Sequence, residues 1–431
     1  MKVSKVDKFL VDLTILCLPF INFKFFSIMG AGIKLMHIVM VAIIIVSIGK
    51  IRISLKRIMM FFFFCAIPIP QLAYINDRPE WFKTYIIYVL IVFFFCFIFK
   101  KYCYCFRKYK KHFILLFLNV MLITQILGII QFALANGLHT FFLDNIFGRF
   151  QYSPNQYDMM FGFYRSYSLY IEPSFFGWVI NLSITVLLFS NKTIISKKKR
   201  IRRLIISIMA LLCTLSTTAF FFLLIILFVY ILSLKKVRKY VFPIMIGALI
   251  AFFCLWEFTN ILAPLKRLTS INNVGSSGYE RIVAPWNYVK AVMKTHPLFG
   301  RGLGQEGNVD SIGTIGKFGG VHNALFGIVV NFGLMSFIFF GIFIVNSYKK
   351  YLVNKKIVLL CFAIVAMYAS TGSYLSLDTF FFLIVMLATI NASATVKEKC
   401  IRNNRIFLYE KAINKKKHRY NSYLKNGGYK I

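Results

Sequence analysis

Acidic side chains are scarce in this chain of 431 residues, which carries 14 Asp and Glu against 52 Lys and Arg. The few carboxylates form no cluster that would demand a metal ion, so we expect neither a metal nor a cofactor. No Walker-type loop of the form GxxxxGK(S/T) is present, so ATP is not expected to supply energy. The nine cysteines avoid the segments expected outside the cytoplasm and offer no second pair of zinc ligands, which argues against disulfides and zinc.

Long polar stretches are also rare. Hydrophobic residues make up 59% of the chain, and the mean hydropathy is +0.71. Apolar runs of about 17–25 residues, the length that crosses a bilayer, recur from end to end. This composition excludes a soluble domain and indicates an integral membrane protein.

The net charge of +38 invites a nucleic-acid interpretation, but the distribution of the charge argues against it. Of the 52 Lys and Arg, 39 lie in short clusters between apolar runs. Such clusters stay in the cytoplasm and fix the orientation of membrane proteins. We therefore expect the lipid bilayer, and no nucleic acid, as a partner. The clusters are residues 1–8, 49–57, 100–112, 191–203, 235–240, 347–356 and the tail from Val396.

Placing every basic cluster in the cytoplasm predicts an all-α integral membrane protein with about twelve transmembrane helices and both termini cytoplasmic. The run 204–234 has basic clusters on both sides, so we expect LSTTAF, residues 215–220, to turn the chain in a hairpin between two short limbs. No cleavable signal peptide is evident, and the clusters fit a multi-pass protein of a bacterial inner membrane. The predicted spans are 9–26, 31–48, 58–75, 81–99, 113–135, 169–190, 204–216, 218–234, 241–258, 322–346, 357–373 and 379–395.

Residues 1–395 are thus predicted to form one polytopic transmembrane domain, followed by a basic cytoplasmic tail, residues 396–431. Two periplasmic loops, residues 136–168 and 259–321, are too long to be mere connections. Ten of the 14 acids also fall on the periplasmic side, so we expect the functional groups there.

The first periplasmic loop leads into YRSYSLYIEPSFFG, residues 164–177. Arg165 lies just before a predicted span, where outer arginines are disfavoured. It either binds substrate or extends its charged end to the interface. Glu172 and Pro173 lie where the next helix should begin, so Glu172 is either a functional carboxylate or a residue that complements the positive helix end.

The second loop contains GYERIVAPWNYVKAVMKTHPLFGRGLG, residues 278–304. Apolar residues at near-helical spacing predict a surface helix over residues 279–294, with Arg281 in its first turn. Pro297 ends this helix, and the glycines beyond it form either a loop that binds phosphate oxygens or a simple cluster of turns. We expect His296 to be structural. The spaced apolar residues are Ile282, Trp286, Val289, Val292 and Met293.

His322 and Asn323 follow a pair of glycines and begin the predicted span 322–346. The positive N-terminal end of a helix disfavours an imidazolium, so a histidine there tends to stay neutral and can accept a proton. His322 is therefore either a general base or an interfacial histidine without chemistry.

Taken together, these segments resemble the bacterial O-antigen polymerase and ligase superfamily, and most of all its Wzy-type polymerases. The similar parts are Arg165 followed by EPSFFG, GYERIVAPW with the later HPLFGRGLG, and HN leading into a span. The ligase-type signature of His, Asn, nine residues and Gly is similar to residues 322–333, although Ser336 stands where that signature often has Gly, Thr or Tyr. The polymerase pattern of Arg, ten residues and Gly is not matched, because eleven residues separate Arg165 from Gly177 and Val292 stands at the position counted from Arg281.

The resemblance implies a GT-C-like polytopic glycosyltransferase whose substrate is an oligosaccharide repeat unit on undecaprenyl pyrophosphate. A sugar hydroxyl would attack the anomeric carbon at the periplasmic face while the lipid pyrophosphate departs. By the same resemblance, His322 takes the proton of the hydroxyl, Arg165 and Arg281 bind the pyrophosphate, and a chain-length regulator protein is a further partner to consider. Supporting roles fall to Glu172, Asn323 and Arg301.

Two alternatives stay open. The first is an O-antigen ligase, which shares this chemistry but transfers the glycan to lipid A–core. The second is a polytopic flippase of lipid-linked oligosaccharide, which would need charged residues lining a cavity inside the spans. Most polar groups of this chain lie in the two periplasmic loops instead, so the polymerase is the preferred hypothesis.

Overall fold

The computed structural model of the chain describes part of the sequence. The described residues are 4–20, 24–28, 31–48, 54–75, 78–141, 159–160, 162–170, 172–190, 194–233, 283–304 and 323–338, with the single positions 143, 146, 247 and 279. Arg281, His322, the predicted spans 357–373 and 379–395, the tail 396–431 and nearly all of 241–258 lie outside these residues.

The described chain is mostly helical. Three helical stretches among these residues are long and apolar enough to cross a membrane, and they correspond to the predicted spans 58–75, 81–99 and 113–135. The expectation of a mostly helical membrane protein is therefore confirmed. The α-helices are α1 Lys5–Cys17, α2 Leu35–Ile48, α3 Leu55–Ala66, α4 Arg78–Phe93, α5 Phe99–Lys108, α6 Lys110–Gly137, α8 Pro173–Phe189, α9 Lys197–Thr214, α10 Thr217–Ser233, α13 Ala284–Thr295 and α14 Ala324–Phe332; η1 Leu18–Phe20 and η2 Ile69–Ala73 are 3-10 helices, and Phe94–Ile98 is a π-helical stretch.

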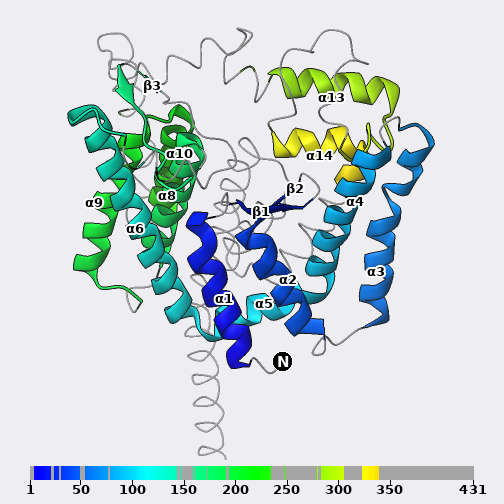
Figure 1. Cartoon of the computed structure of the whole chain (residues 1–431), viewed down its shortest axis with the longest axis horizontal. Helices are drawn as coiled ribbons and strands as arrows, with labels where there is room; N and C mark the ends of the chain where they lie inside the picture. Colours follow the sequence, from blue (N-terminus) through cyan, green and yellow to red (C-terminus); the bar gives the residue numbers. More distant parts are fainter. Residues whose placement is uncertain are drawn as a thin grey trace, which may run out of the picture.

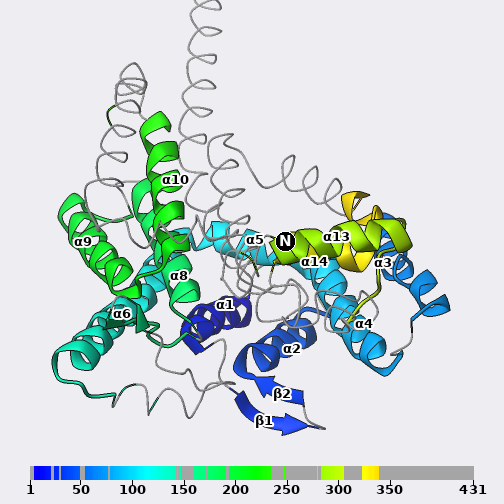
Figure 2. The ribbon, with the colours of Figure 1, turned by 90° about the horizontal axis from the view of Figure 1, so that it is seen from above.

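The helices gather in two groups (Figures 1 and 2). One group contains α6, α8, α9 and α10, and the other contains α3, α4, α13 and α14, with α1, α2 and α5 between them. The start of α1 and the helix α5 lie at one end of the molecule, whereas α13 and α14 lie at the opposite end. We call these the α5 end and the α13 end.

The N-terminal part corrects two predicted spans. Residues 24–28 and 31–34 are strands, β1 Lys24–Ile28 and β2 Ala31–Lys34, which pair in antiparallel fashion. The span 9–26 is therefore wrong beyond η1, and the helix of span 31–48 begins only at Leu35. Pro19 lacks the N–H that a continuing helix needs, and the aromatic pair Phe25-Phe26 followed by glycines favours a hairpin.

Two further spans begin or end differently from the prediction. The helix of span 169–190 begins at Pro173, because a residue that precedes proline avoids the helical conformation. The continuous span 322–346 is also wrong, since α14 has 9 residues and the chain then turns at Gly333. At about 1.5 Å per residue, α14 is too short to cross a bilayer. In Figure 1 it lies across the α13 end.

The hairpin predicted within residues 204–234 is confirmed. The helix breaks at Leu215, which adopts a φ of 46°. The contacts on α8 show that the two limbs run in opposite directions: Arg200 at the start of α9 donates to the carbonyl of Ser190 after the end of α8. Near the end of α10, the ring of Tyr230 lies 5.5 Å from that of Phe189 at the end of α8.

Packing also places the basic cluster 191–203 at the α5 end. The helix α6 begins directly after α5, and α9 runs beside it in the same direction. Arg203 donates to the side chain of Asn119, and farther along Ser207 donates to that of Gln125. The described residues of the clusters 1–8, 100–112 and 191–203 therefore lie at one end, as expected of segments that share one side of a membrane.

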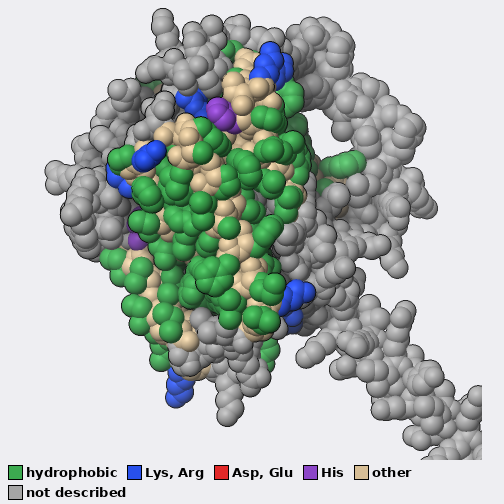
Figure 3. Space-filling model, turned by 90° about the vertical axis from the view of Figure 1, so that its right-hand side faces the viewer, with side chains coloured by type: hydrophobic (Ala, Val, Ile, Leu, Met, Phe, Trp, Pro, Cys, Tyr) green, Lys and Arg blue, Asp and Glu red, His purple; other side chains and the backbone are tan. Residues whose placement is uncertain are grey.

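A band of apolar side chains covers the outer faces of α3 and α4 (Figure 3). Lys and Arg side chains lie above and below this band. Met59 and Phe62 on α3 are 64% and 65% exposed, and Ile86 on α4 is 61% exposed. Large exposed apolar side chains in such a band are typical of a surface that contacts lipid.

Candidate active site

The segment that carries Arg165 is held against the end of α6. The amide of Gln131 is the main anchor, because its Oε1 accepts hydrogen bonds from the Ser166 hydroxyl (3.1 Å) and from the N–H groups of Tyr167 (3.1 Å) and Ser168 (2.8 Å). One turn later, Asn136 donates to the Tyr164 carbonyl and accepts from its N–H. This extended segment is therefore fixed to a helix on both sides of Arg165.

Arg165 itself reaches the end of α9. Its Nε donates to the carbonyl oxygen of Thr214, the last residue of that helix, at 3.1 Å. The neighbouring Ser166 N–H donates to Cys213 O at 2.9 Å. A cation is favourable at a helix C-terminus, where the carbonyl groups carry partial negative charge. The helix ends at this point, so α6 and α9 together position the guanidinium at the α13 end.

Glu172 and Pro173 begin α8, as the sequence indicates. Glu172 is the N-cap residue and Pro173 the first helical residue. The Glu172 side chain does not cap the helix by a hydrogen bond; instead it accepts a hydrogen bond from the Ser174 hydroxyl. Its carboxylate nevertheless lies at the positive end of the helix, where a negative charge is favoured.

The second group of candidate residues lies where the loop after α13 packs on the end of α14. Two backbone hydrogen bonds join the segments: Arg301 N–H donates to Val330 O at 2.7 Å, and Leu334 N–H donates to Pro297 O at 2.8 Å. Gly300 and Gly333 have positive φ values of 73° and 55°. A Cβ atom at Gly300 would lie 2.5 Å from Val330 O, and one at Gly333 would collide with Pro297 O. Only glycine fits these two positions without a shift of the backbone.

A single buried amide joins this loop and α14 to two other elements. The Gln71 side chain of η2 is fully buried. Its Nε2 donates to Phe299 O (2.8 Å) and Asn331 O (2.7 Å), and its Oε1 accepts from Trp81 Nε1 (3.0 Å) and Leu303 N (3.1 Å). These four bonds use the full capacity of a carboxamide. We call this set the Gln71 junction.

Aromatic rings complete the junction. The ring of Tyr74 stacks on His296 with 4.3 Å between the centroids, and its hydroxyl donates to Gly300 O at 2.7 Å. His296 is thus held in a packed contact, in agreement with its expected structural role. The Arg301 guanidinium and the Tyr288 hydroxyl of α13 interact electrostatically. Burial lowers the pKa of Arg301 and raises the pKa of Tyr288.

The signature HN-x9-G corresponds to one short helix. Asn323 precedes α14, is buried, and its Oδ1 accepts from the N–H of Phe326. The helix then occupies the nine residues Ala324–Phe332, and Gly333 follows in the left-handed conformation. Asn323 is therefore the N-cap residue and Gly333 the glycine that ends the helix.

The structure thus brings the candidate residues together in two sets. Arg165 and Glu172 lie beside the ends of α6 and α9 and the start of α8. Arg301 lies in the loop after α13, and Asn323 directly precedes α14. Both sets lie toward the α13 end (Figure 1). The described residues contain no group of three or more His, Cys, Asp or Glu that could hold a metal. No motif or spacing in the sequence identified the residues that anchor these segments, which are Gln71, Tyr74, Gln131 and Asn136.

Comparison with known proteins gives one finding. The model of the family described as WcaD colanic acid polymerase matches residues 12–392 of the 431. No curated protein matches the chain. The family match covers the Arg165 segment, the Gln71 junction and α14, together with the positions of Arg281 and His322.

Proposed function

Because the chain belongs to the WcaD colanic acid polymerase family, a Wzy-type O-antigen polymerase-like family, we propose that it joins oligosaccharide repeat units carried on undecaprenyl pyrophosphate. Membership makes the protein a polymerising glycosyltransferase of surface polysaccharide. The lipid-linked donor, the periplasmic face of the bacterial inner membrane and a multi-pass topology belong to the proposal. The observation that carries it is the match over residues 12–392.

In the proposed reaction, a sugar hydroxyl of one repeat unit attacks the anomeric carbon of another. The new glycosidic bond forms as the bond from that carbon to the pyrophosphate oxygen breaks, and undecaprenyl pyrophosphate leaves. His322 accepts the proton of the attacking hydroxyl. It directly precedes the N-cap residue of α14 in the sequence, and the positive end of that helix favours a neutral imidazole.

Arginines bind the departing pyrophosphate in this scheme. Arg165 is suited to this role because the hydrogen bonds around it fix its segment to α6 and α9. Little conformational freedom is therefore lost when it binds the substrate. Its planar guanidinium matches the geometry of phosphate oxygens. We propose Arg281 as its partner, with Arg301, Glu172 and Asn323 in support. Arg301 lies on the loop that the Gln71 junction ties to α14.

The experiment is a polymerisation assay with purified protein and lipid-linked repeat units. The expected product is a ladder of longer glycans. The variants His322→Ala, Arg165→Ala and Arg281→Ala should each abolish the ladder, whereas His139→Asn should not. His139 is an exposed histidine with positive φ, which Asn tolerates, so it is a matched control.

Other outcomes point to the alternatives. Consumption of the repeat units only when lipid A–core is present would indicate a ligase. Movement of the substrate across the bilayer without a covalent change would indicate a flippase. A normal ladder from all three variants would place the active site elsewhere in the chain.

A further inference from the structure

The α5 end has a corner where the first helix meets the junction of α5 and α6. In Figure 1, α5 lies across this end beside the start of α1. Lys5, Lys8 and Asp12 are spaced i, i+3 and i+7, so they share one face of α1. The junction of α5 and α6 brings Lys108, Tyr109 and Lys111 to the same place. We call Lys5, Lys8, Lys108, Tyr109 and Lys111 the basic corner.

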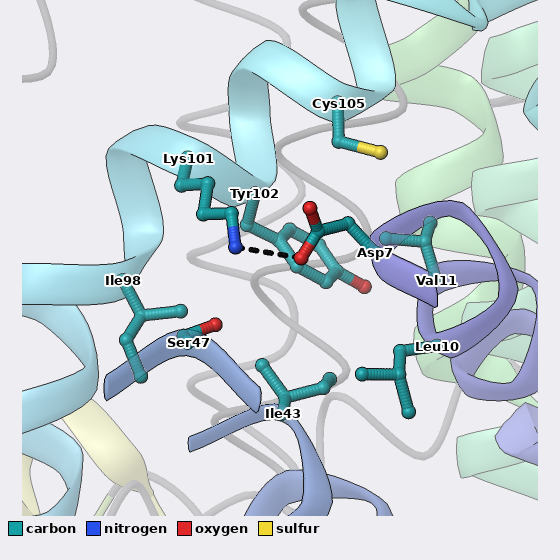
Figure 4. A pocket seen from close by; sticks show the side chains of 9 residues that line it. All are labelled: Asp7, Leu10, Val11, Ile43, Ser47, Ile98, Lys101, Tyr102 and Cys105. Atoms are coloured by element: carbon teal, nitrogen blue, oxygen red, sulfur yellow. Dashed lines mark hydrogen bonds and ion pairs between the residues drawn. The ribbon is translucent and has the colours of Figure 1, made fainter. Parts of the chain in front are cut away.

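The acids of this corner are already engaged. Asp7 accepts a hydrogen bond of 2.6 Å from the Lys101 ammonium group, and both side chains are 8% exposed (Figure 4). Asp12 lies 2.6 Å from Nε2 of His112. Of the acids that the structure describes, Glu80 and Glu172 begin helices at the α13 end. Within the described part of the chain, the charge of the corner is therefore positive.

The ammonium groups converge on one aromatic ring. Lys8 Nζ lies 5.7 Å and Lys108 Nζ 5.2 Å from the centroid of Tyr109. The two cations are thus at most about 11 Å apart, so their positive charges add at one place. Lys8 is half-buried and Lys108 exposed; Lys5 and Lys111 are exposed and add to the local positive potential. Such an arrangement attracts an anion.

Apolar surface adjoins these cations. Phe9 on α1 is 60% exposed, and Tyr104 on α5, one turn before Lys108, is 42% exposed. Phe9 follows Lys8 directly and lies one turn from Lys5. A ligand that joins a phosphate to hydrocarbon chains satisfies both kinds of surface, whereas a free phosphate satisfies only the first. Basic residues beside a span are also where anionic lipid headgroups bind.

We propose that the basic corner binds the headgroup of an anionic phospholipid, with an acyl chain along Phe9. This site lies at the α5 end and is separate from the candidate active site at the α13 end. It does not depend on the proposed reaction, so each proposal can fail without the other.

Native mass spectrometry of the full-length protein in detergent tests this site, with phosphatidylglycerol and phosphatidylcholine as probes. Phosphatidylglycerol should bind more tightly, and the double variant Lys8→Gln/Lys108→Gln should weaken its binding by about tenfold. Binding of phosphatidylcholine should not change. The variant Lys8→Arg/Lys108→Arg, which retains both charges, should bind phosphatidylglycerol like the unchanged protein.

The control is Lys197→Gln/Lys198→Gln, which removes two exposed charges from the start of α9 at the same end. Equal weakening in both Gln variants would mean diffuse attraction to the whole basic end and would overturn the site. So would equal affinity of the unchanged protein for the two lipids. Soluble glycerol phosphate should not displace the lipid at equal concentration; displacement would show that the site recognises phosphate alone.

Discussion

Replacing Gln71 by leucine should weaken the attachment between α14 and the loop that carries Arg301. Leucine fills a similar volume but can form none of the bonds of the Gln71 junction. Two carbonyls, Phe299 O and Asn331 O, would lose a donor, while Trp81 Nε1 and Leu303 N would lose an acceptor. At about 1 kcal/mol of net stabilisation for each bond, the loss amounts to about 4 kcal/mol. That is a large part of the stability of a typical domain, about 5–15 kcal/mol.

Gln125→Leu is the matched control. Gln125 is also a buried glutamine within an apolar helical stretch, but the bond from Ser207 to its Oε1 is the contact that it makes in the described chain. Its Nε2 finds no partner among the residues described. Leucine here removes one bond and one buried unsatisfied donor, so the change should stay under about 1 kcal/mol.

Thermal unfolding of the purified protein in detergent measures both effects. Gln71→Leu should unfold at a clearly lower temperature than Gln125→Leu, and it should also give shorter glycan ladders in the polymerisation assay. If the two variants unfold together, near the unchanged protein, the junction does not hold the loop on α14 and the reasoning fails.

Three further predictions concern other parts of the chain. Arg165→Ala should lower the rate of polymerisation by about 100–1000-fold. Arg165→Lys should restore little of it, because lysine cannot form two parallel hydrogen bonds to a phosphate group. Full activity of the lysine variant in the ladder assay would contradict the binding of pyrophosphate by Arg165. Gly333→Ala should lower the unfolding temperature, because Gly333 has a positive φ and an added Cβ would meet Pro297 O. Gly137→Ala should not lower it, because the space around Gly137 is open. Equal unfolding temperatures of the two variants would contradict the close packing of Gly333 on the loop after α13. Asp7→Asn leaves the buried Lys101 without its carboxylate and should cost about 3–5 kcal/mol of stability at neutral pH, measured by denaturation. Burial raises the pKa of Asp7, but the bonds from Lys101 and Ser4 outweigh it and lower the pKa below 3.8, so this contribution should be lost only as the pH falls below that value.

Local chemistry explains which elements could be predicted from the sequence. The start of α8 follows from Pro173, the end of α13 from Pro297, and the hairpin after α9 from basic clusters on both sides of one apolar run. The two prolines act within a few residues of the helix end that they determine, and the basic clusters flank the run that they divide. The first span failed for a related reason, because average hydropathy does not register the effect of Pro19 or of the following glycines on a helix.

The contacts that hold the candidate site could not be predicted in this way. Gln71 binds partners 228 to 260 positions away in the sequence. Gln131, within the predicted span 113–135, holds the Arg165 segment to α6, and so does Asn136, which the sequence placed just after that span. A polar residue in a predicted span has two meanings, a functional group or an anchor for a distant backbone. In each of these cases the structure shows the anchor.

The spacing of the HN-x9-G signature has a physical reason in α14. The Asn323 side chain accepts a hydrogen bond from the N–H of Phe326 at the start of the helix. Gly333 ends the helix in a left-handed conformation, and its lack of a side chain lets Pro297 O approach closely. At the same end, Asn331 O receives a hydrogen bond from Gln71 Nε2, and Val330 O receives one from Arg301 N. The last carbonyl groups of a helix generally find their partners outside it. A helix one residue longer or shorter would shift Gly333 by about 100° around the axis and 1.5 Å along it, away from the loop. The number of residues between Asn323 and Gly333 therefore sets the position of Asn323 relative to the loop that carries Arg301.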